Sequence, residues 1–380
     1  MTKIAFIVGE PSGDRIGADL IAHLRTKLDD RLEVFGLGGE AMEAEGLQSL
    51  FDIEELSIIG IGAIVARLPQ LMRRVSQTAK AVIDAEPDAL VVIDSPTFSH
   101  RIAKRLRKAK PHIPIINYIP PTVWAWREER AEKMRGYIDY AICTFPFEPD
   151  FYKRLNGPPA TYVGHPILTE PHLAPLLDMP LGTRPPNNPP RLIILPGSRR
   201  GEIDRLLDDF GKTFQRLNEM LPGIEGAIPT LPRHRARIET EVFKWKHQPK
   251  IVTGHDERWA AFASADAALA ASGTVSLELA LAGIPMALAY RLDPIGYRFR
   301  HLITAWTAAL PNFIAGHPLV PEHFHEIVRP EHLARRMERL LTDTPERRAQ
   351  IEGFKDIRDK MTIDRAPGEA AAEIVLRMLR

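Results

Sequence analysis

Two series of short apolar segments, separated by a proline-rich stretch, constrain the fold of this chain more than any other feature. Each segment has the length and β-branched content of a buried strand, and amphipathic helical patterns lie between the segments. The first series comprises Ile4–Val8, Val34–Leu37, Ala89–Ile93, Ile115–Tyr118 and Tyr140–Thr144. The second comprises Arg191–Leu195, Ala227–Pro229, Ile251–Val252, Ala267–Leu269 and Met286–Ala289. Because strands that alternate with helices form parallel sheets covered on both faces, the sequence predicts an α/β fold with two Rossmann-like, doubly wound domains.

The length of 380 residues suits two domains with separate cores. We expect an N-terminal domain over residues 1–170, a linker over 171–190, a C-terminal domain over 191–360 and a C-terminal helix over 361–380. The linker ends in a run of prolines that excludes regular structure. Ligands of open parallel sheets bind outside the carboxyl ends of the strands, so we expect the site in a cleft between the two domains.

Charge and cysteine content exclude several classes of protein. The formal net charge is +1, so no nucleic-acid partner is indicated. A single cysteine, Cys143, allows no intramolecular disulfide and is typical of a buried apolar position. The N-terminal apolar run reaches a Gly-Glu-Pro turn before a signal peptide could be completed, so we expect the protein to stay in the cytoplasm. The low-charge tract Trp259–Tyr290 is interrupted by acids, glycines and a proline and is interpreted as core rather than as a membrane span.

The C-terminal half carries two turns that are typical of phosphate binding. "ILPGSRRGEI" places Ser198 and Arg199 between a strand and a helix, where free N–H groups and a guanidinium could neutralise a diphosphate. "AASGTVSLE" places Ser272, Gly273 and Thr274 in a similar position. A plain connection with surface arginines, or simple N-capping by the hydroxyls, would give the same pattern. Glu278 lies in an otherwise apolar helix and therefore needs a partner, such as a ribose diol or an arginine.

The N-terminal half offers candidates on the acceptor side. Asp94 ends a buried strand in "VVIDSPTF", where a carboxylate can act as a general base or form an Asx turn. In "GEPSGD" the same ambiguity applies to Glu10 and Asp14, and for Asp14 we favour capping of the helix that follows it. Trp124 and Trp126, in "PPTVWAWREER", either line an acceptor pocket or fasten a loop to the sheet.

Two further patterns concern metals and membranes. His165 and the group His317, His323 and His325 lack the spacing of a metal site, so no metal is expected there. Apolar and basic residues lie together in "LSIIGIGAIVARLPQLMRR", and six cations occur between residues 101 and 110. Such surfaces suit an anionic bilayer or an acyl chain, although core helices with solvated faces look similar.

Seven segments, in this order, together resemble the hallmark motifs of the lipid-A-disaccharide synthase family. They are "GEPSGD", "IDSPTF", "PPTVWAWREER", "VGHP", "LPGSRRGEI", "ASGTVSLE" and "LPNFIAG". The resemblance extends from the N-terminus to about the C-terminal helices and implies a GT-B glycosyltransferase. It implies an inverting transfer of a diacylglucosamine from UDP-2,3-diacylglucosamine to 2,3-diacylglucosamine 1-phosphate, giving lipid A disaccharide 1-phosphate and UDP. It also implies no cofactor, a location on the cytoplasmic face of the inner membrane, and two lipid substrates as partners; a homodimer is left open.

The resemblance assigns roles to individual residues. Asp94 would be the base for the acceptor 6-hydroxyl, Arg199 with Ser198 would stabilise the departing UDP, and Glu278 would hold the ribose. The remaining substrate contacts would be Glu10, Ser12, Gly13, Trp124, Ser272, Gly273, Thr274 and Asn312. Thr97, Ser99 and Arg200 depart from the usual family pattern. Two alternatives remain: another GT-B sugar-nucleotide enzyme, such as a hexosaminyltransferase or a UDP-GlcNAc 2-epimerase, and a non-catalytic lipid- or nucleotide-binding relative.

Overall fold

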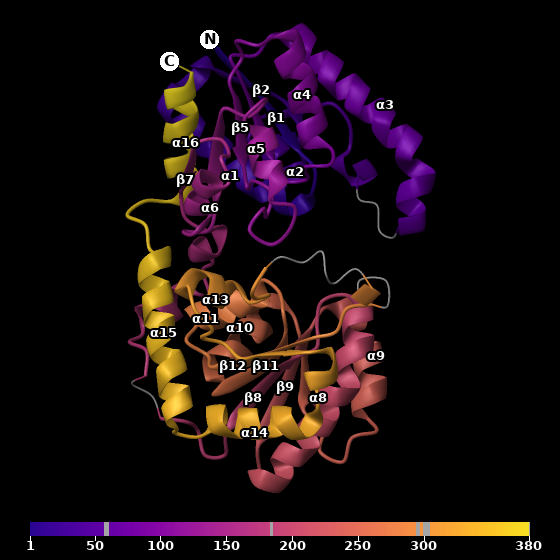
Figure 1. Ribbon diagram of the computed structural model, residues 1–380, viewed down its shortest axis with the longest axis vertical. Coiled ribbons are helices and arrows are strands. Elements are labelled where there is room, and N and C mark those ends of the chain that lie inside the picture. The colour runs from indigo at the N-terminus through magenta and orange to yellow at the C-terminus, as the bar shows by residue number, and fades with distance from the viewer. Residues whose placement is uncertain (57–60, 183–184, 294–296, 299–304, 380) are drawn as a thin grey trace. The chain divides into compact units, whose positions relative to one another are not determined.

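The computed structural model describes residues 1–379 except 57–60, 183–184, 294–296 and 299–304. The contacts divide the chain into two compact units, Met1–Pro166 with Ile363–Arg380, and Ile167–Thr362 (Figure 1). Each unit is built around one parallel sheet, as the alternating pattern predicts. Residues 171–190 belong to the second unit and include a short helix, α7 (Ala174–Asp178).

The sheet of the first unit has seven parallel strands in the order β3-β2-β1-β4-β5-β6-β7. Its strands are β1 (Thr2–Val8), β2 (Leu32–Leu37), β3 (Gln48–Ser49), β4 (Ala89–Ile93), β5 (Ile115–Tyr118), β6 (Tyr140–Cys143) and β7 (Ala160–Tyr162). Successive apolar side chains point to opposite faces of a strand. Accordingly, Ile4, Phe6 and Val8 of β1 pack into the core on one face, and Ala5 and Ile7 into the core on the other.

Helices cover both faces of this first sheet. They are α1 (Pro11–Leu28), α2 (Glu40–Ala44), α3 (Ile61–Ala85), α4 (Ser99–Ala109), α5 (Glu129–Met134), α6 (Glu148–Arg154) and α16 (Pro367–Met378). The C-terminal helix α16 packs against α1, where Ala371, Ile374 and Val375 join the core that contains Leu20 and Leu24. The end of the chain therefore contributes to the core of the first unit.

The sheet of the second unit has six parallel strands in the order β10-β9-β8-β11-β12-β13. They are β8 (Arg191–Leu195), β9 (Glu225–Thr230), β10 (Lys250–Thr253), β11 (Ala267–Ala271), β12 (Met286–Tyr290) and β13 (Glu322–Phe324). The other helices of this unit are α8 (Arg200–Met220), α9 (Pro232–Val242), α10 (His255–Ser264), α11 (Val275–Leu281), α13 (Leu310–Ala315), α14 (Pro330–Leu341) and α15 (Pro345–Met361). Helices α8 and α14 pack on each other over the main core of the unit.

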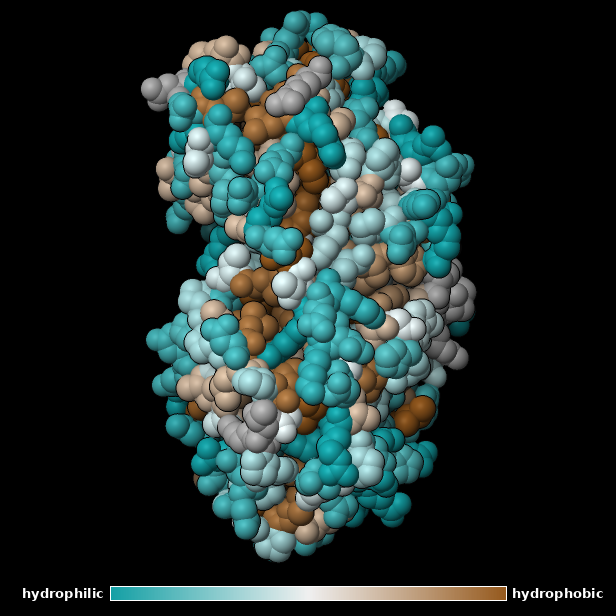
Figure 2. All heavy atoms as spheres, turned by 90° about the vertical axis from the view of Figure 1, so that its left-hand side faces the viewer, coloured by the Kyte–Doolittle hydropathy of each residue, from teal (hydrophilic) through white to brown (hydrophobic). Residues whose placement is uncertain are grey.

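The low-charge tract Trp259–Tyr290 folds as α10, β11, α11 and β12, with most of its apolar residues buried. Within the described residues, no helix combines the length and the apolar character needed to cross a bilayer. In the view of Figure 2, polar side chains cover most of the surface, and hydrophobic residues show mainly in strips between them.

Candidate functional site

In the first unit, the candidate residues gather where strand order reverses, at the carboxyl ends of the neighbouring strands β1 and β4. Such switch points are the usual ligand positions in open α/β sheets. The turn after β1 and the turn after β4 approach so closely that a Cβ on Gly9 would lie 2.1 Å from the Cβ of Ser95. Glycine at position 9 therefore allows the "GEPSGD" turn to pack against the Asp94 turn. Gly13 contributes to the same packing, since a Cβ there would lie 2.8 Å from Val8 Cγ1.

Asp94 occupies a strained turn at this edge of the sheet. Asp94 and Ser95 have φ angles of 54° and 44°, a left-handed conformation that costs free energy for residues other than glycine. The backbone N–H of Ser95 donates to Asp94 Oδ1 at 2.6 Å. Burial raises the pKa of the Asp94 carboxyl above its ordinary value, and the Ser95 hydrogen bond only partly opposes this. A carboxylate with a raised pKa binds a proton more readily, as a general base must.

The side chains of the "GEPSGD" turn have different surroundings. Glu10 is exposed at the start of α1 and makes no side-chain hydrogen bond that caps this helix. Ser12 is also exposed and lines a cavity of about 1030 Å³ together with Arg15 and Glu40. Asp14 is almost buried, and its carboxylate accepts the N–H groups of Gly39, Ala41 and Met42 at 2.8–3.1 Å. Asp14 therefore caps α2, so the expectation that it caps the helix following it was wrong.

Trp124 lies inside the first unit rather than on its surface. Its side chain is 8% exposed and packs edge-to-face on Phe147, and its indole N–H donates to Glu148 Oε1 at 3.1 Å. Glu148 Oε2 accepts the N–H groups of Thr144 and Phe145. Burial raises the pKa of Glu148 to about 7, against the opposing effect of these N–H donors. These contacts fasten the loop to the sheet, one of the two roles expected for this tryptophan. Its role as a substrate contact stays a prediction.

The first turn of the second unit follows β8 and contains Ser198 and Arg199. Glu202, in the first turn of α8, accepts the N–H groups of Ser198 and Arg199 through Oε2 at 3.1 and 3.2 Å. Its Oε1 lies 3.0 Å from the Arg199 guanidinium, whose side chain is 82% exposed. Gly197, with a φ of 125°, leaves the space that the Glu202 side chain fills. The sequence suggested that the N–H groups of this turn are free. In the structure, the Glu202 carboxylate accepts those of Ser198 and Arg199.

The second turn, Ser272-Gly273-Thr274, lies between β11 and α11 and is open. The Ser272 hydroxyl donates to the carbonyl of Ala308, and a Cβ on Gly273 would meet nothing within 4 Å. Within the described residues, the structure gives the N–H groups of Gly273 and Thr274 no hydrogen-bond acceptor. This turn therefore has room and donors for an anionic group.

Glu278 finds its partner in Arg258, on the first turns of α10. The two side chains form an ion pair, and both are mostly buried, with 18% of Glu278 and 29% of Arg258 exposed. Burial lowers the pKa of the Arg258 guanidinium. Of the two partners foreseen for Glu278, the structure has an arginine. Sequence reasoning missed Arg258, although the need of Glu278 for a partner was the signal that could have found it.

These elements surround one cavity of about 630 Å³ at the carboxyl ends of β8 and β11. Its lining includes the candidates Ser198, Arg199, Ser272, Gly273, Thr274 and Glu278, and also Glu202, Leu231, His255 and Arg258. The cavity is thus bounded by two turns, two arginines and two acids. A cavity of this volume with cationic and N–H groups on its wall can accept a small ligand that carries negative charge.

Asn312 lies apart from this cavity lining. It is 1% exposed, and its Oδ1 accepts the N–H groups of Leu319 and Val320 at 2.9 and 2.7 Å. Its Nδ2 donates to Thr307 Oγ1 and to the carbonyl of Val320. The amide therefore holds the segment after α13 in place, and a direct contact with a nucleotide stays a prediction.

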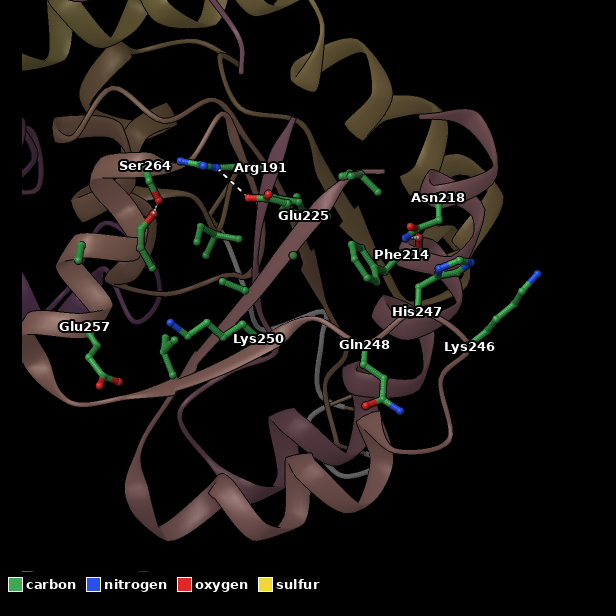
Figure 3. Close-up of a pocket in the computed structure, with 18 residues that line it drawn as sticks. Arg191, Phe214, Asn218, Glu225, Lys246, His247, Gln248, Lys250, Glu257 and Ser264 are labelled. Carbon is green, nitrogen blue, oxygen red and sulfur yellow. Dashed lines mark hydrogen bonds and ion pairs between the residues drawn. The ribbon is translucent and has the colours of Figure 1, made fainter. Parts of the chain in front are cut away.

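A second, larger cavity of about 840 Å³ lies at the opposite, amino ends of β8 and β9 (Figure 3). On its wall, Arg191 pairs with Glu225 at 2.9 Å. Lys246 extends away from the other labelled residues. Since ligands of open α/β sheets bind at the carboxyl ends, we assign the candidate site to the smaller cavity.

The histidines considered in the sequence are differently placed. Burial lowers the pKa of His165 to about 4, and its ring packs against Phe145. His323 is buried, with Nδ1 3.3 Å from the carbonyl oxygen of Leu288. His317 lines a third cavity, of about 630 Å³, beside Trp306.

Comparisons with known proteins connect this geometry to a family. A family model described as lipid-A-disaccharide synthetase matches residues 4–375. A lipid-A-disaccharide synthase from Rhodopseudomonas palustris (strain HaA2) is 46% identical over 381 residues, covering 100% of this chain and 96% of the relative. One from Nitrobacter winogradskyi is 45% identical, with the same coverage.

Solved structures support the fold at much lower identity. A UDP-GlcNAc 2-epimerase from Neisseria meningitidis bound to UDP-GlcNAc has a TM-score of 0.58 at 13% identity, covering 100% of this chain and 99% of that one. The glycotransferase of kitacinnamycin has a TM-score of 0.61 at 14% identity, with the same coverage. These likenesses confirm the expected α/β fold of two Rossmann-like domains.

Proposed function

The chain belongs to the lipid-A-disaccharide synthetase family, and from this premise we propose how its residues share the reaction. It is a glycosyltransferase that joins a UDP-activated diacylglucosamine to a diacylglucosamine 1-phosphate, forming the lipid A disaccharide and releasing UDP. An inverting displacement of this kind needs a base at the acceptor hydroxyl and charge neutralisation at the leaving diphosphate.

The leaving diphosphate and its uridine occupy the 630 Å³ cavity of the second unit. Ser272, Gly273 and Thr274 receive the diphosphate on the open turn, and Arg199 approaches it from the other turn. The exposed guanidinium of Arg199 is free to swing from Glu202 to a phosphate oxygen, because only one surface ion pair restrains it. Charge-assisted hydrogen bonds of this type stabilise the negative charge that develops as the glycosidic bond breaks.

Glu278 holds the ribose diol of the UDP moiety. A carboxylate can accept two hydroxyl donors at once, and the ion pair with Arg258 holds this one at the cavity wall. Ser198 supports the diphosphate instead, through the turn it shares with Arg199.

Asp94 takes the proton from the acceptor 6-hydroxyl in the first unit. The carboxylate is partly buried, has a raised pKa and ends the central strand β4, so it meets the requirements of a general base. Glu10, Ser12 and Gly13, on the adjoining turn, form the rim that receives the acceptor sugar.

The single observation that carries the nucleotide assignment is the meeting of both Gly-Ser turns and Glu278 on one cavity wall. We expect UDP alone to bind the full-length protein and Glu278→Gln to raise its Kd about 10- to 100-fold, as one lost charge-assisted hydrogen bond predicts. Isothermal titration calorimetry measures both values. Glu352→Gln removes an exposed carboxylate that pairs with Lys355, and is the matched control. Equal affinity of the Glu278 variant and the control would refute this assignment of the ribose site.

The lipid substrates imply contact with a membrane surface, and we place this contact partly on α4. Arg101, Lys104 and Lys108 project from this helix into solvent, whereas Arg107 is held by an ion pair with Asp139. Ile58 and Ile59, from the segment of mixed apolar and basic residues, lie outside the described residues. The contact belongs to the cytoplasmic face of the inner membrane, where both lipid substrates would be available.

This surface is tested with the triple variant Arg101→Glu, Lys104→Glu, Lys108→Glu. Each exposed cation contributes about 1 kcal/mol of attraction to an anionic bilayer, so the variant is expected to bind anionic vesicles roughly 100-fold more weakly. Sedimentation with vesicles measures the partition, and vesicles of neutral lipid are the control. Unchanged partition onto anionic vesicles would exclude α4 from the contact.

A further inference from the structure

Three side chains with metal-binding atoms converge in the second unit, beside the cavity described above. Glu170 and His172 follow the short 3₁₀ helix Pro166–Thr169, and His255 is the first residue of α10. Glu170 Oε1 lies 2.9 Å from His172 Nδ1 and 3.0 Å from His255 Nε2. One ligand atom from each residue lies within 4.8 Å of the other two. Two imidazoles therefore point at one carboxylate oxygen.

The surroundings of His172 resemble the outer shell of a metal site. Its other ring nitrogen, Nε2, lies 3.0 Å from Asp256 Oδ1, so the ring is held at both ends. A carboxylate on the far nitrogen fixes the tautomer and the orientation of a metal-binding histidine and makes it a stronger ligand. Trp259 stacks on the same ring with an interplanar angle of 8° and covers one of its faces. The ring is thus oriented by groups that do not themselves belong to the triad.

The two separations from Glu170 are close to those between neighbouring ligand atoms of a tetrahedral ion. Zinc binds imidazole nitrogen and carboxylate oxygen at about 2.0–2.2 Å, which places neighbouring ligand atoms roughly 3.3 Å apart. The two Glu170 separations are a few tenths of an ångström shorter because hydrogen bonds now join these atoms. A bound ion takes the place of the N–H protons, and a small outward movement of the exposed His255 side chain opens the required space.

We propose that Glu170, His172 and His255 bind one divalent transition-metal ion, with Asp256 supporting His172 from behind. Two imidazoles and one carboxylate favour ions of the zinc, cobalt and nickel class over magnesium or calcium, which prefer oxygen ligands. Three protein ligands leave at least one coordination position to water. The ion joins the segment after residue 166 to the start of α10. Since His255 lines the nucleotide cavity and Arg258 lies one turn further along α10, the ion positions the arginine that pairs with Glu278.

The test is a titration of metal-free, full-length protein with Co²⁺, followed by its visible absorption bands, and with Zn²⁺ in competition with a chromophoric chelator. We expect one ion per chain, loss of binding in His172→Ala, and roughly 10- to 100-fold weaker binding in Asp256→Asn. His332→Ala removes an exposed histidine of α14 and is the matched control. Absence of cobalt absorption in the native protein would overturn the proposal, as would equal binding by His172→Ala and His332→Ala.

Thermal unfolding provides a second readout that does not depend on activity. Zn²⁺ in excess is expected to raise the Tm of the native protein, because an ion that binds only the folded state stabilises it. The same addition should leave the Tm of His255→Ala unchanged, and this variant serves if His172→Ala does not fold. An equal rise of Tm in both proteins would assign the effect to other sites and would refute the triad.

Discussion

The carboxyl edges of the two sheets are built from the same strand–turn–helix units but carry different charge chemistry. At the edge of the first sheet, Asp94 sits in a strained turn, and within the described residues its carboxylate has no cation as a partner. At the edge of the second sheet, Glu202 holds Arg199 and Glu278 holds Arg258. At the first edge Asp94 thus has no cation as a partner among the described residues, whereas the two acids of the second edge already bind cations.

This difference separates two kinds of chemistry. A buried carboxylate without a cation has a raised pKa and takes up a proton readily, which suits removal of a proton from an alcohol. A carboxylate paired with an arginine keeps its charge and orients the guanidinium, which suits binding of a nucleotide. The comparison shows that the fold determines where a carboxylate lies, whereas the residues in contact with that carboxylate determine its chemical role.

The change with the largest expected effect removes the acid of the first edge. Asp94→Asn keeps the size and the left-handed turn, which asparagine tolerates, but cannot accept the proton. We expect kcat to fall about 10²- to 10⁴-fold, the usual contribution of a general base. UDP release in the presence of both lipid substrates measures the rate. Asp84→Asn, at a surface ion pair with Lys80, is the control. Full activity of the Asp94 variant would end its assignment as the base.

The raised pKa of Asp94 also affects the stability of the protein and the pH dependence of its rate. The folded pKa of Asp94 is raised, so the folded protein binds the proton more tightly than the unfolded chain, and stability declines as pH rises from the unfolded to the folded pKa. At neutral pH, Asp94→Asn should therefore have a higher Tm than the native protein. The native rate should fall as pH drops below the raised pKa of Asp94. A native profile with no acidic decline would contradict the assignment.

A smaller effect is expected at the second edge, where Arg199→Ala removes a cation from the leaving group. Loss of one charge-stabilising donor costs roughly 10²- to 10³-fold in rate. Because the Arg199 side chain is 82% exposed, the free energy of unfolding should change by less than about 0.5 kcal/mol. Arg216→Ala, on α8, breaks a surface ion pair with Glu331 of α14 and is the control. If both variants lost rate equally, Arg199 would have no special role.

Sequence patterns predict the interior strands of both sheets well and most of the outermost strands poorly. The segments Ala89–Ile93 and Arg191–Leu195 become β4 and β8 with the expected bounds, because their residues are apolar and mostly buried. The strands β3, β7 and β13 were not predicted. They are short, lie at sheet edges and are only partly buried, so they lack the apolar signal on which the prediction depends.

The candidate site shows a similar limit. The two Gly-Ser turns could be placed on one cavity because each follows a recognisable strand. The partners of the charged side chains could not, since they come from distant segments: Arg258 for Glu278, and the N–H groups at the start of α2 for Asp14. The convergence of Glu170 with His255 is of the same kind. Pairings of this sort depend on tertiary packing, which local periodicity does not report.

The smallest expected effect concerns Glu202, whose carboxylate occupies the N–H groups of Ser198 and Arg199. A diphosphate approaching this turn meets a like charge and must displace it. Glu202→Gln keeps an oxygen acceptor for the turn but removes the charge, so we expect UDP to bind about 3- to 10-fold more tightly. The N-terminus of α8 should lose about 0.5–1 kcal/mol of stability, since a negative charge there interacts favourably with the helix dipole.

Asp204→Asn distinguishes this local effect from a change in net charge. Asp204 lies in the same first turns of α8 and carries the same charge, but its carboxylate pairs with Arg237 and Arg200 instead of the turn. Calorimetric titration with UDP should show tighter binding in Glu202→Gln and little change in Asp204→Asn. Equal tightening in both would mean that only overall charge matters. Weaker binding in Glu202→Gln would mean that the carboxylate preorganises Arg199 for the diphosphate, so the acids of the second edge would assist the ligand rather than compete with it.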